Sequence, residues 1–136
     1  MDNYILKFDS NVESSEFLAE SLNKYFYKFW KENLKEKVQK LNFVKTKGES
    51  ERFTVSFSKH ELLFYGSDRG LIYALYYFLE KLGWRFFNPN CEVLLSNKCL
   101  LNFDSDFEFT FEPKFEYRLS LWSDVNTEWA IKNGLN

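Results

Sequence analysis

An apolar stripe near the middle of the chain constrains the fold more than any other feature of the sequence. Four apolar residues recur at spacings of four, three and four: Leu71, Leu75, Phe78 and Leu82. This spacing places them on one face of an α-helix. Gly66-Ser67-Asp68 supplies a turn and an N-cap, and Gly83 ends the helix from the position that favours a left-handed residue. The sequence therefore predicts a helix whose striped face is buried against a sheet.

The segments on either side of this helix alternate in the way that strands do. Residues 53–58 place Phe and Val between Thr and Ser, and residues 62–65 resume an apolar run after Ser58-Lys59-His60-Glu61. This pattern predicts a β-hairpin with its tip at the polar segment. Shorter strands are expected at residues 4–8, 38–44, 84–87, 92–95 and 107–111, and a final extended run at 115–121.

A second, earlier helix is expected from a stripe of Leu18, Leu22, Tyr25 and Phe29. Ser10, followed three residues later by Glu13, has the form of a capping box and predicts the start of this helix. We expect the helix to end between Trp30 and Leu34. The charged stretch from Lys31 to Lys40 could extend this helix or begin a loop, and Val38 to Val44 is a candidate strand.

These elements predict an α+β fold, a two-layer sandwich in which two helices cover one face of a mainly antiparallel sheet. The chain has 136 residues, of which 45% are hydrophobic and 21% aromatic, enough for a packed core. It is too short for an eight-stranded α/β barrel, which needs roughly 250 residues. We expect one domain over residues 1–112 and a boundary near Pro113.

Charge and cysteine content exclude several classes of function. The net charge is -2 and both signs are scattered, whereas a nucleic-acid binder shows a basic stripe. Cys91 and Cys99 lack the partners of a zinc site or a disulfide framework, so we expect ordinary thiols, no metal and no cofactor. No export or membrane signal follows Met1. The expectation is a protein that is cytoplasmic by default, or one whose true start is missing.

The segment from Leu63 to Pro89 resembles a known pattern: a hairpin, a Gly66-x-x-x-Gly70 turn, a helix bearing Tyr73-Ala74 and ending in Leu82-Gly83, then an aromatic strand. It is similar to the accessory domain that precedes the catalytic barrel in β-hexosaminidases, α-glucuronidases and related glycosidase-like proteins. Residues 112–118, Glu-Pro-Lys-Phe-Glu-Tyr-Arg, resemble the junction that leads into the first barrel strand of those enzymes.

This resemblance implies that residues 113–136 are the start of a truncated catalytic TIM barrel. It implies a carbohydrate substrate that the chain meets through that barrel, and no membrane or nucleic-acid partner. Arg118 is then the residue that holds sugar hydroxyls, with Trp122 and Asp124 as further substrate-binding residues. Ser123 separates these two, and Leu119 stands where those enzymes have glycine. A plain ion pair to an acidic neighbour is an equally good interpretation of Arg118.

No catalytic residue is predicted within the chain. Glycoside hydrolysis needs two carboxyl groups across the scissile bond, and the acidic cluster Asp104, Asp106, Glu108 and Glu112 alternates with Phe as the wet face of a strand would. His60, the only histidine, is expected in an exposed turn. We therefore expect no enzyme activity from this chain, although the full-length protein would be a glycosidase. The alternative is a stand-alone carbohydrate-binding or protein-binding module, whereas an independent small hydrolase has no supporting motif.

Overall fold

The computed structural model describes residues 3–9, 12–47, 51–88, 90–95, 99–112 and 132. Three strands and three helical segments come first: β1 (Ile5–Phe8), α1 (Ser15–Tyr25), α2 (Tyr27–Phe29), a π-helical turn at Trp30–Leu34, β2 (Lys40–Lys45) and β3 (Phe53–Ser58). The second half contains β4 (Glu61–Gly66), α3 (Asp68–Leu82), β5 (Trp84–Asn88), β6 (Cys91–Leu94) and β7 (Phe107–Phe111).

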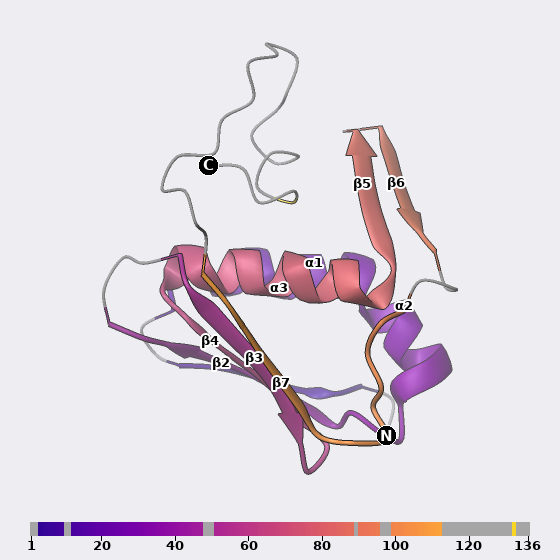
Figure 1. The fold of residues 1–136 in the computed structure, drawn as a ribbon, viewed down its shortest axis with the longest axis horizontal. Helices are drawn as coiled ribbons and strands as arrows, with labels where there is room; N and C mark the ends of the chain where they lie inside the picture. Colours follow the sequence, from indigo (N-terminus) through magenta and orange to yellow (C-terminus); the bar gives the residue numbers. More distant parts are fainter. Residues whose placement is uncertain are drawn as a thin grey trace.

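Five strands form one sheet in the order β1-β2-β4-β3-β7, and β5 and β6 form a separate two-stranded ribbon. Figure 1 shows α1 and α3 on one side of the five-stranded sheet, while the ribbon projects from the helix layer on the side away from the sheet. The expected two-layer α+β fold is confirmed. Of the five strand pairs in the described residues, three are antiparallel, and the two parallel pairs join β2 to β1 and to β4.

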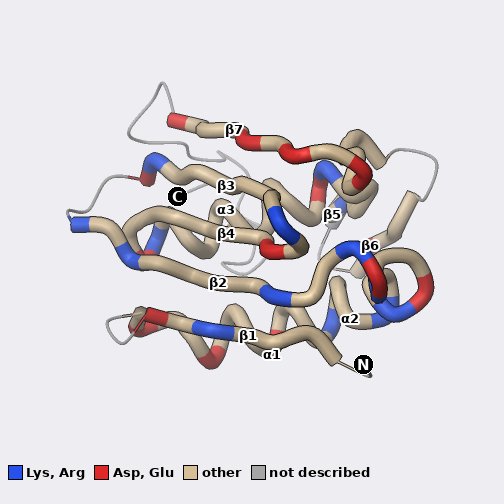
Figure 2. The backbone as a smooth tube through the Cα atoms, turned by 90° about the horizontal axis from the view of Figure 1, so that it is seen from below, with Lys and Arg blue, Asp and Glu red and all other residues tan. Residues whose placement is uncertain are grey.

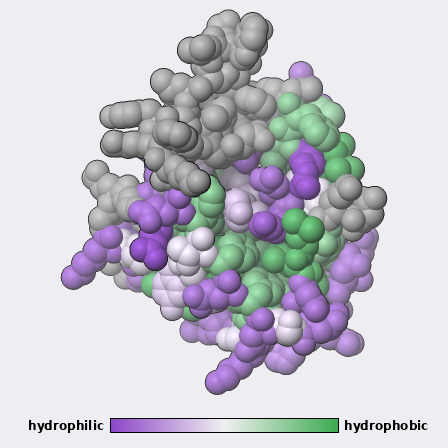
Figure 3. All heavy atoms as spheres, in the orientation of Figure 1, coloured by the Kyte–Doolittle hydropathy of each residue, from purple (hydrophilic) through white to green (hydrophobic). Residues whose placement is uncertain are grey.

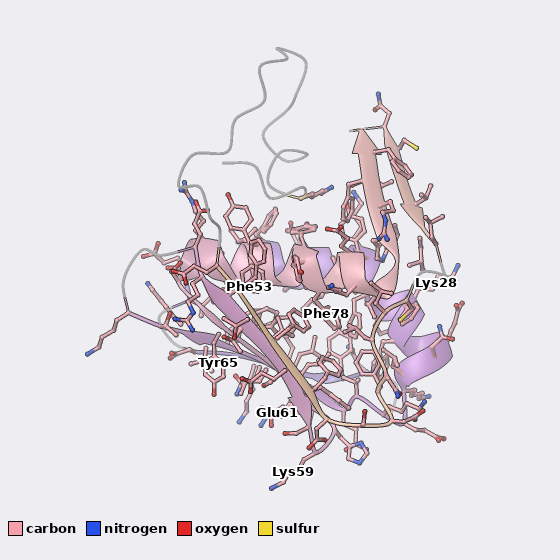
Figure 4. All side chains as sticks on the ribbon, viewed as in Figure 1. Lys28, Phe53, Lys59, Glu61, Tyr65 and Phe78 are labelled. Carbon is pink, nitrogen blue, oxygen red and sulfur yellow. The ribbon has the colours of Figure 1, made fainter. Side chains whose placement is uncertain are left out.

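The predicted stripe on α3 faces the sheet and is completely buried. Leu71, Leu75, Phe78 and Leu82 are all 0% exposed. The Phe78 ring meets the edge of Phe64 on β4 with the ring centroids 5.5 Å apart, and Phe64 stacks on Phe43 of β2 at 4.5 Å. Figure 4 shows Phe78 between α3 and the sheet. These rings fill the space between α3 and the sheet, where the helical spacing of the stripe predicted a buried face.

The start of α1 differs from the expected capping box. The helix begins at Ser15, several residues after the predicted cap at Ser10, and its N-cap Ser14 makes no side-chain capping bond. Ser10 itself lies outside the described residues. Asp68, far away in the sequence, instead accepts a hydrogen bond of 2.8 Å from the backbone N–H of Glu13. A carboxylate from α3 therefore takes the part that a local side chain was expected to play.

The predicted hairpin between β3 and β4 is confirmed, with Lys59 and His60 as its two-residue turn. Both residues have positive φ, 51° and 65°. Two positive φ angles define the type I′ turn, whose twist matches that of the strands. His60 is exposed, as expected, and its Nδ1 lies 2.9 Å from the carbonyl oxygen of Lys37, which makes this nitrogen the donor.

The face of the sheet opposite the helices is largely polar. Thr54 on β3 and Thr110 on β7 are hydrogen-bonded through their hydroxyls at 2.9 Å, and Asn42 on β2 donates to Glu61 on β4 at 3.4 Å. Figure 2 shows this face, with acidic residues along β7 at one edge. No helix in the described part of the chain is long and apolar enough to cross a membrane.

Candidate functional site

The predicted substrate-binding residues Arg118, Trp122 and Asp124 all lie outside the described residues, as do the extended run at 115–121 and the boundary at Pro113. The structure does describe β7, the strand that precedes these residues in the chain. β7 is an edge strand, and its last residue, Phe111, lies opposite Phe53 of β3. The Phe111 ring packs against Tyr77 of α3 with centroids 5.2 Å apart. The chain thus leaves the sheet beside the helix layer.

The Gly66-x-x-x-Gly70 motif lies where β4 passes into α3. A Cβ atom on Gly66 would meet the carbonyl carbon of Gly70 at 3.2 Å and the carbonyl oxygen of Arg52 at 3.3 Å. Ser67, the N-cap of α3, accepts a hydrogen bond of 3.0 Å from the backbone N–H of Gly70. The motif therefore serves close packing of the turn on the helix, and its residues are part of the scaffold.

Asp68 joins the beginnings of both helices to β2. Its carboxylate accepts from the backbone N–H of Glu13 at 2.8 Å and forms an ion pair of 2.8 Å with Lys45. Desolvation alone would raise the pKa of Asp68, but the hydrogen bonds from Lys45 and from the backbone before α1 outweigh it, so the pKa lies below its usual value. The next residue, Arg69, forms an ion pair with Glu51 at 3.3 Å.

The Leu82-Gly83 step sets the direction of the β5–β6 ribbon. Gly83 ends α3 with a φ of 119°, and a Cβ atom there would come within 2.3 Å of the carbonyl oxygen of Leu95. The backbone N–H of Leu95 in turn donates to the Gly83 carbonyl at 2.8 Å. Both the left-handed conformation and the close approach require glycine. This residue fixes the base of the ribbon against the end of the helix.

A buried polar cluster lies between α1 and the ribbon. Lys132 donates to the Tyr25 hydroxyl at 2.5 Å and to the Glu92 carboxylate at 2.6 Å, and its side chain is only 5% exposed. Its ammonium group also lies 5.0 Å from the centre of the Tyr25 ring and 5.6 Å from that of Phe86. We call Tyr25, Phe86 and Glu92 the Lys132 cage.

Hydrogen bonding within the cage is consistent with a protonated tyrosine. Burial raises the pKa of Tyr25, and the neighbouring Lys132 offsets only part of that effect. The hydroxyl therefore keeps its proton and donates it to both oxygens of Glu92 at 3.0 Å, while it accepts from Lys132. The indole N–H of Trp84 donates to the Tyr25 carbonyl at 2.9 Å, which ties the ribbon to α1 beside the cage.

The acidic cluster near β7 is exposed but is not a single strand face. Asp104 and Asp106 precede the strand, and Asp104 pairs with Lys37 at 2.8 Å. Glu108 is on β7 and exposed, and Glu112 is exposed just after it. Among the described residues no group of three or more His, Cys, Asp or Glu side chains could hold a metal ion. Cys91 and Cys99 are free thiols.

Exposed aromatic and aliphatic side chains are scattered over several elements. Tyr65 on β4 is 38% exposed, Phe111 on β7 41%, Phe87 on β5 59% and Leu100 in the segment after β6 70%. On the face seen in Figure 3, apolar atoms gather toward the ribbon side, whereas the lower rim of the molecule is hydrophilic. Among the described residues, the exposed rings of Tyr65, Phe87 and Phe111 thus lie on three different strands.

Sequence reasoning missed the Lys132 cage because its members are far apart along the chain. Tyr25 was assigned to an apolar stripe and Glu92 to a short strand, and Lys132 follows them by 107 and 40 residues. No local spacing marks such a set. The one available signal is that a tyrosine interrupts the aliphatic stripe of the first helix. No family model, no curated protein and no solved structure matches this chain.

Proposed function

We propose that this chain is the non-catalytic accessory domain of a glycoside hydrolase, similar to the domain that precedes the barrel in β-hexosaminidases and α-glucuronidases. In this proposal the domain supplies no catalytic acid. It packs against the catalytic barrel of the same protein and supports it during the breakdown of a polysaccharide or glycoconjugate. Arg118, Trp122 and Asp124 contact the carbohydrate at the mouth of that barrel.

The observation that carries the proposal is the burial of α3 on both of its sides. Nine of its fifteen residues are buried, although the sheet covers only one side of the helix layer. A helix that is apolar around most of its circumference belongs in the middle of a structure. On the side away from the sheet, Tyr76 of α3 is hydrogen-bonded to Ser21 of α1 and meets Phe86 of β5 with ring centroids 5.7 Å apart. In this proposal the barrel packs beside α1 and the ribbon and extends the layer that they form over the helix.

The motif residues support the proposal because each has a place in the packing. Gly66 and Gly70 approach each other closely, Ala74 is 0% exposed, and Gly83 has the positive φ and the close neighbour that only glycine tolerates. Their order along the chain is that of the resemblance. These are scaffold roles, which is what the proposal requires of an accessory domain.

Arg118 provides the test of the proposed site, in the protein extended through the barrel. The Arg118→Lys variant keeps the charge but loses the planar fork that donates to two sugar hydroxyls or to a uronate carboxylate. We expect kcat/KM on an aryl glycoside to fall by at least about tenfold, which corresponds to about 1.4 kcal/mol of transition-state stabilisation, with an unchanged melting temperature. An unchanged kcat/KM would remove Arg118 from the site.

A stand-alone binding module is the second candidate, favoured by Tyr65. This ring is exposed on the polar face of the sheet, and Figure 4 shows it pointing away from the helix side. Its cross-strand neighbour is Thr54, a polar side chain beside an aromatic face. Titration of the chain with soluble oligosaccharides tests this candidate: saturable binding that the Tyr65→Ala variant loses would favour the module over the accessory domain.

A further inference from the structure

Burial of the Lys132 ammonium group costs free energy, which contacts with its surroundings must offset. Lysine is almost never fully buried unless it is paired, because an ammonium group loses its hydration on burial. The Lys132 side chain is nevertheless only 5% exposed. Its nitrogen has a carboxylate oxygen at 2.6 Å and a hydroxyl oxygen at 2.5 Å, and two aromatic faces nearby.

The cage has the composition of an ammonium-binding site. A carboxylate supplies the opposite charge, a hydroxyl supplies a second acceptor, and ring faces attract a cation through their quadrupole. The rings are held in place by their neighbours: Trp84 stacks parallel to Phe86 with centroids 6.1 Å apart and meets Tyr25 edge-on at 5.0 Å. The site is therefore built from α1 and both strands of the ribbon.

Lys24 provides an internal comparison. Its ammonium group lies 3.9 Å from the other oxygen of Glu92 and 5.2 Å from the centre of the Tyr25 ring. Its side chain is 63% exposed. The same carboxylate and the same ring thus face one lysine from solvent and another from the interior. Only the interior lysine has the short contacts expected of a docked group.

We propose that the cage of Tyr25, Phe86 and Glu92 is a docking site for the Lys132 ammonium group, and that this contact anchors Lys132 to α1 and the β5–β6 ribbon. The inference deepens the proposed function and rests on it in one respect. If residues 113–136 begin a catalytic barrel, the cage is a joint between the accessory domain and that barrel.

The test is the reactivity of each lysine toward reductive methylation by formaldehyde and cyanoborohydride, measured by mass spectrometry on the whole chain. We expect Lys132 to be methylated at least about tenfold more slowly than Lys24, because its nitrogen must leave the cage before it reacts. In Glu92→Gln, which keeps the size but removes the charge, the rate at Lys132 should rise toward that of Lys24. The matched control Lys24→Met should leave Lys132 protected.

Equal methylation of Lys132 and Lys24 in the unaltered protein would overturn the proposal, and this result requires no variant. Protection of Lys132 that persists in folded Glu92→Gln would also overturn it, since the carboxylate would then be irrelevant. If Glu92→Gln does not fold, Tyr25→Phe removes only one acceptor and should give a rate between the two extremes. No glycosidase assay enters the experiment, so failure of the joint and failure of the proposed function remain distinguishable.

Discussion

The two sides of the helix layer are built from different chemistry. Toward the sheet, α3 presents Leu71, Leu75, Phe78 and Leu82, all fully buried and all apolar. Toward α1 and the ribbon, the contacts are mixed: the Tyr76 and Ser21 hydroxyls are hydrogen-bonded at 2.7 Å, and the Lys132 cage lies nearby. The sheet side supplies the bulk of the stabilising burial, whereas the other side fixes which groups meet, because each polar atom there needs a particular partner.

The largest expected effect comes from a cavity on the sheet side. Phe78→Ala removes a ring that contacts Phe64, Phe26 and Phe103, and should lower the free energy of unfolding by about 3–5 kcal/mol. This loss is measured by urea denaturation of the variant and of the unaltered chain. The exposed Phe87→Ala is the matched control and should change little. If both variants unfold at the same urea concentration, Phe78 is not buried between α3 and the sheet, and the assignment of this face is wrong.

A smaller loss is expected on the mixed side. Tyr76→Phe keeps the ring but leaves the buried Ser21 hydroxyl without this partner, which should lower the free energy of unfolding by about 1–3 kcal/mol. The double variant Tyr76→Phe with Ser21→Ala should recover part of the loss, since no hydroxyl is then left unpaired. Additive losses from the two substitutions would show that the hydrogen bond contributes nothing.

Asp68 extends the comparison to the partly exposed beginnings of the helices. Its pKa is lowered in the folded protein, so its stabilising contribution is present above its unfolded pKa, about 4, and is lost as the pH falls through the folded value. Asp68→Asn should cost about 1 kcal/mol at pH 7, given the exposure of the ion pair with Lys45. The difference in melting temperature between the two proteins should narrow as the pH falls from 7 to 3; a constant difference would contradict this assignment.

The smallest effect is expected at the hairpin tip, remote from both sides of the helix layer. Lys59 has a φ of 51°, which asparagine adopts more readily than lysine. Lys59→Asn should raise the free energy of unfolding by about 0.5 kcal/mol, while Lys59→Ala, the control, should not. Thermal melting of the two variants measures these changes. A stabilised alanine variant would indicate that removal of the charge, and not relief of backbone strain, is responsible.

The sequence could predict features that depend on nearby residues, but not contacts between segments that are far apart along the chain. The stripe on α3, the alternation in β3 and β7, and the Gly83 cap depend on neighbours within a few residues, and each was assigned correctly. The parallel pairs of β2 with β1 and β4 depend on which segments meet, and strand periodicity does not encode this.

Long-range polar contacts were beyond sequence reasoning for the same reason. Glu13 was assigned to a capping box with Ser10, but its backbone N–H instead donates to Asp68, 55 residues away. The cage spans 107 residues between Tyr25 and Lys132. Such contacts become visible only when the fold brings the elements together. The predicted sugar-binding residues Arg118, Trp122 and Asp124 stay predictions, since they lie outside the described residues.

The most direct measurement for the proposed function compares two proteins on a panel of aryl glycosides: residues 1–136 alone, and the product of the whole reading frame that contains them. We expect turnover from the longer protein and none from residues 1–136, since the paired carboxylates of a glycosidase would lie on the barrel. Turnover by residues 1–136 that follows the protein through size-exclusion chromatography would contradict the account, and so would a reading frame that stops at Asn136.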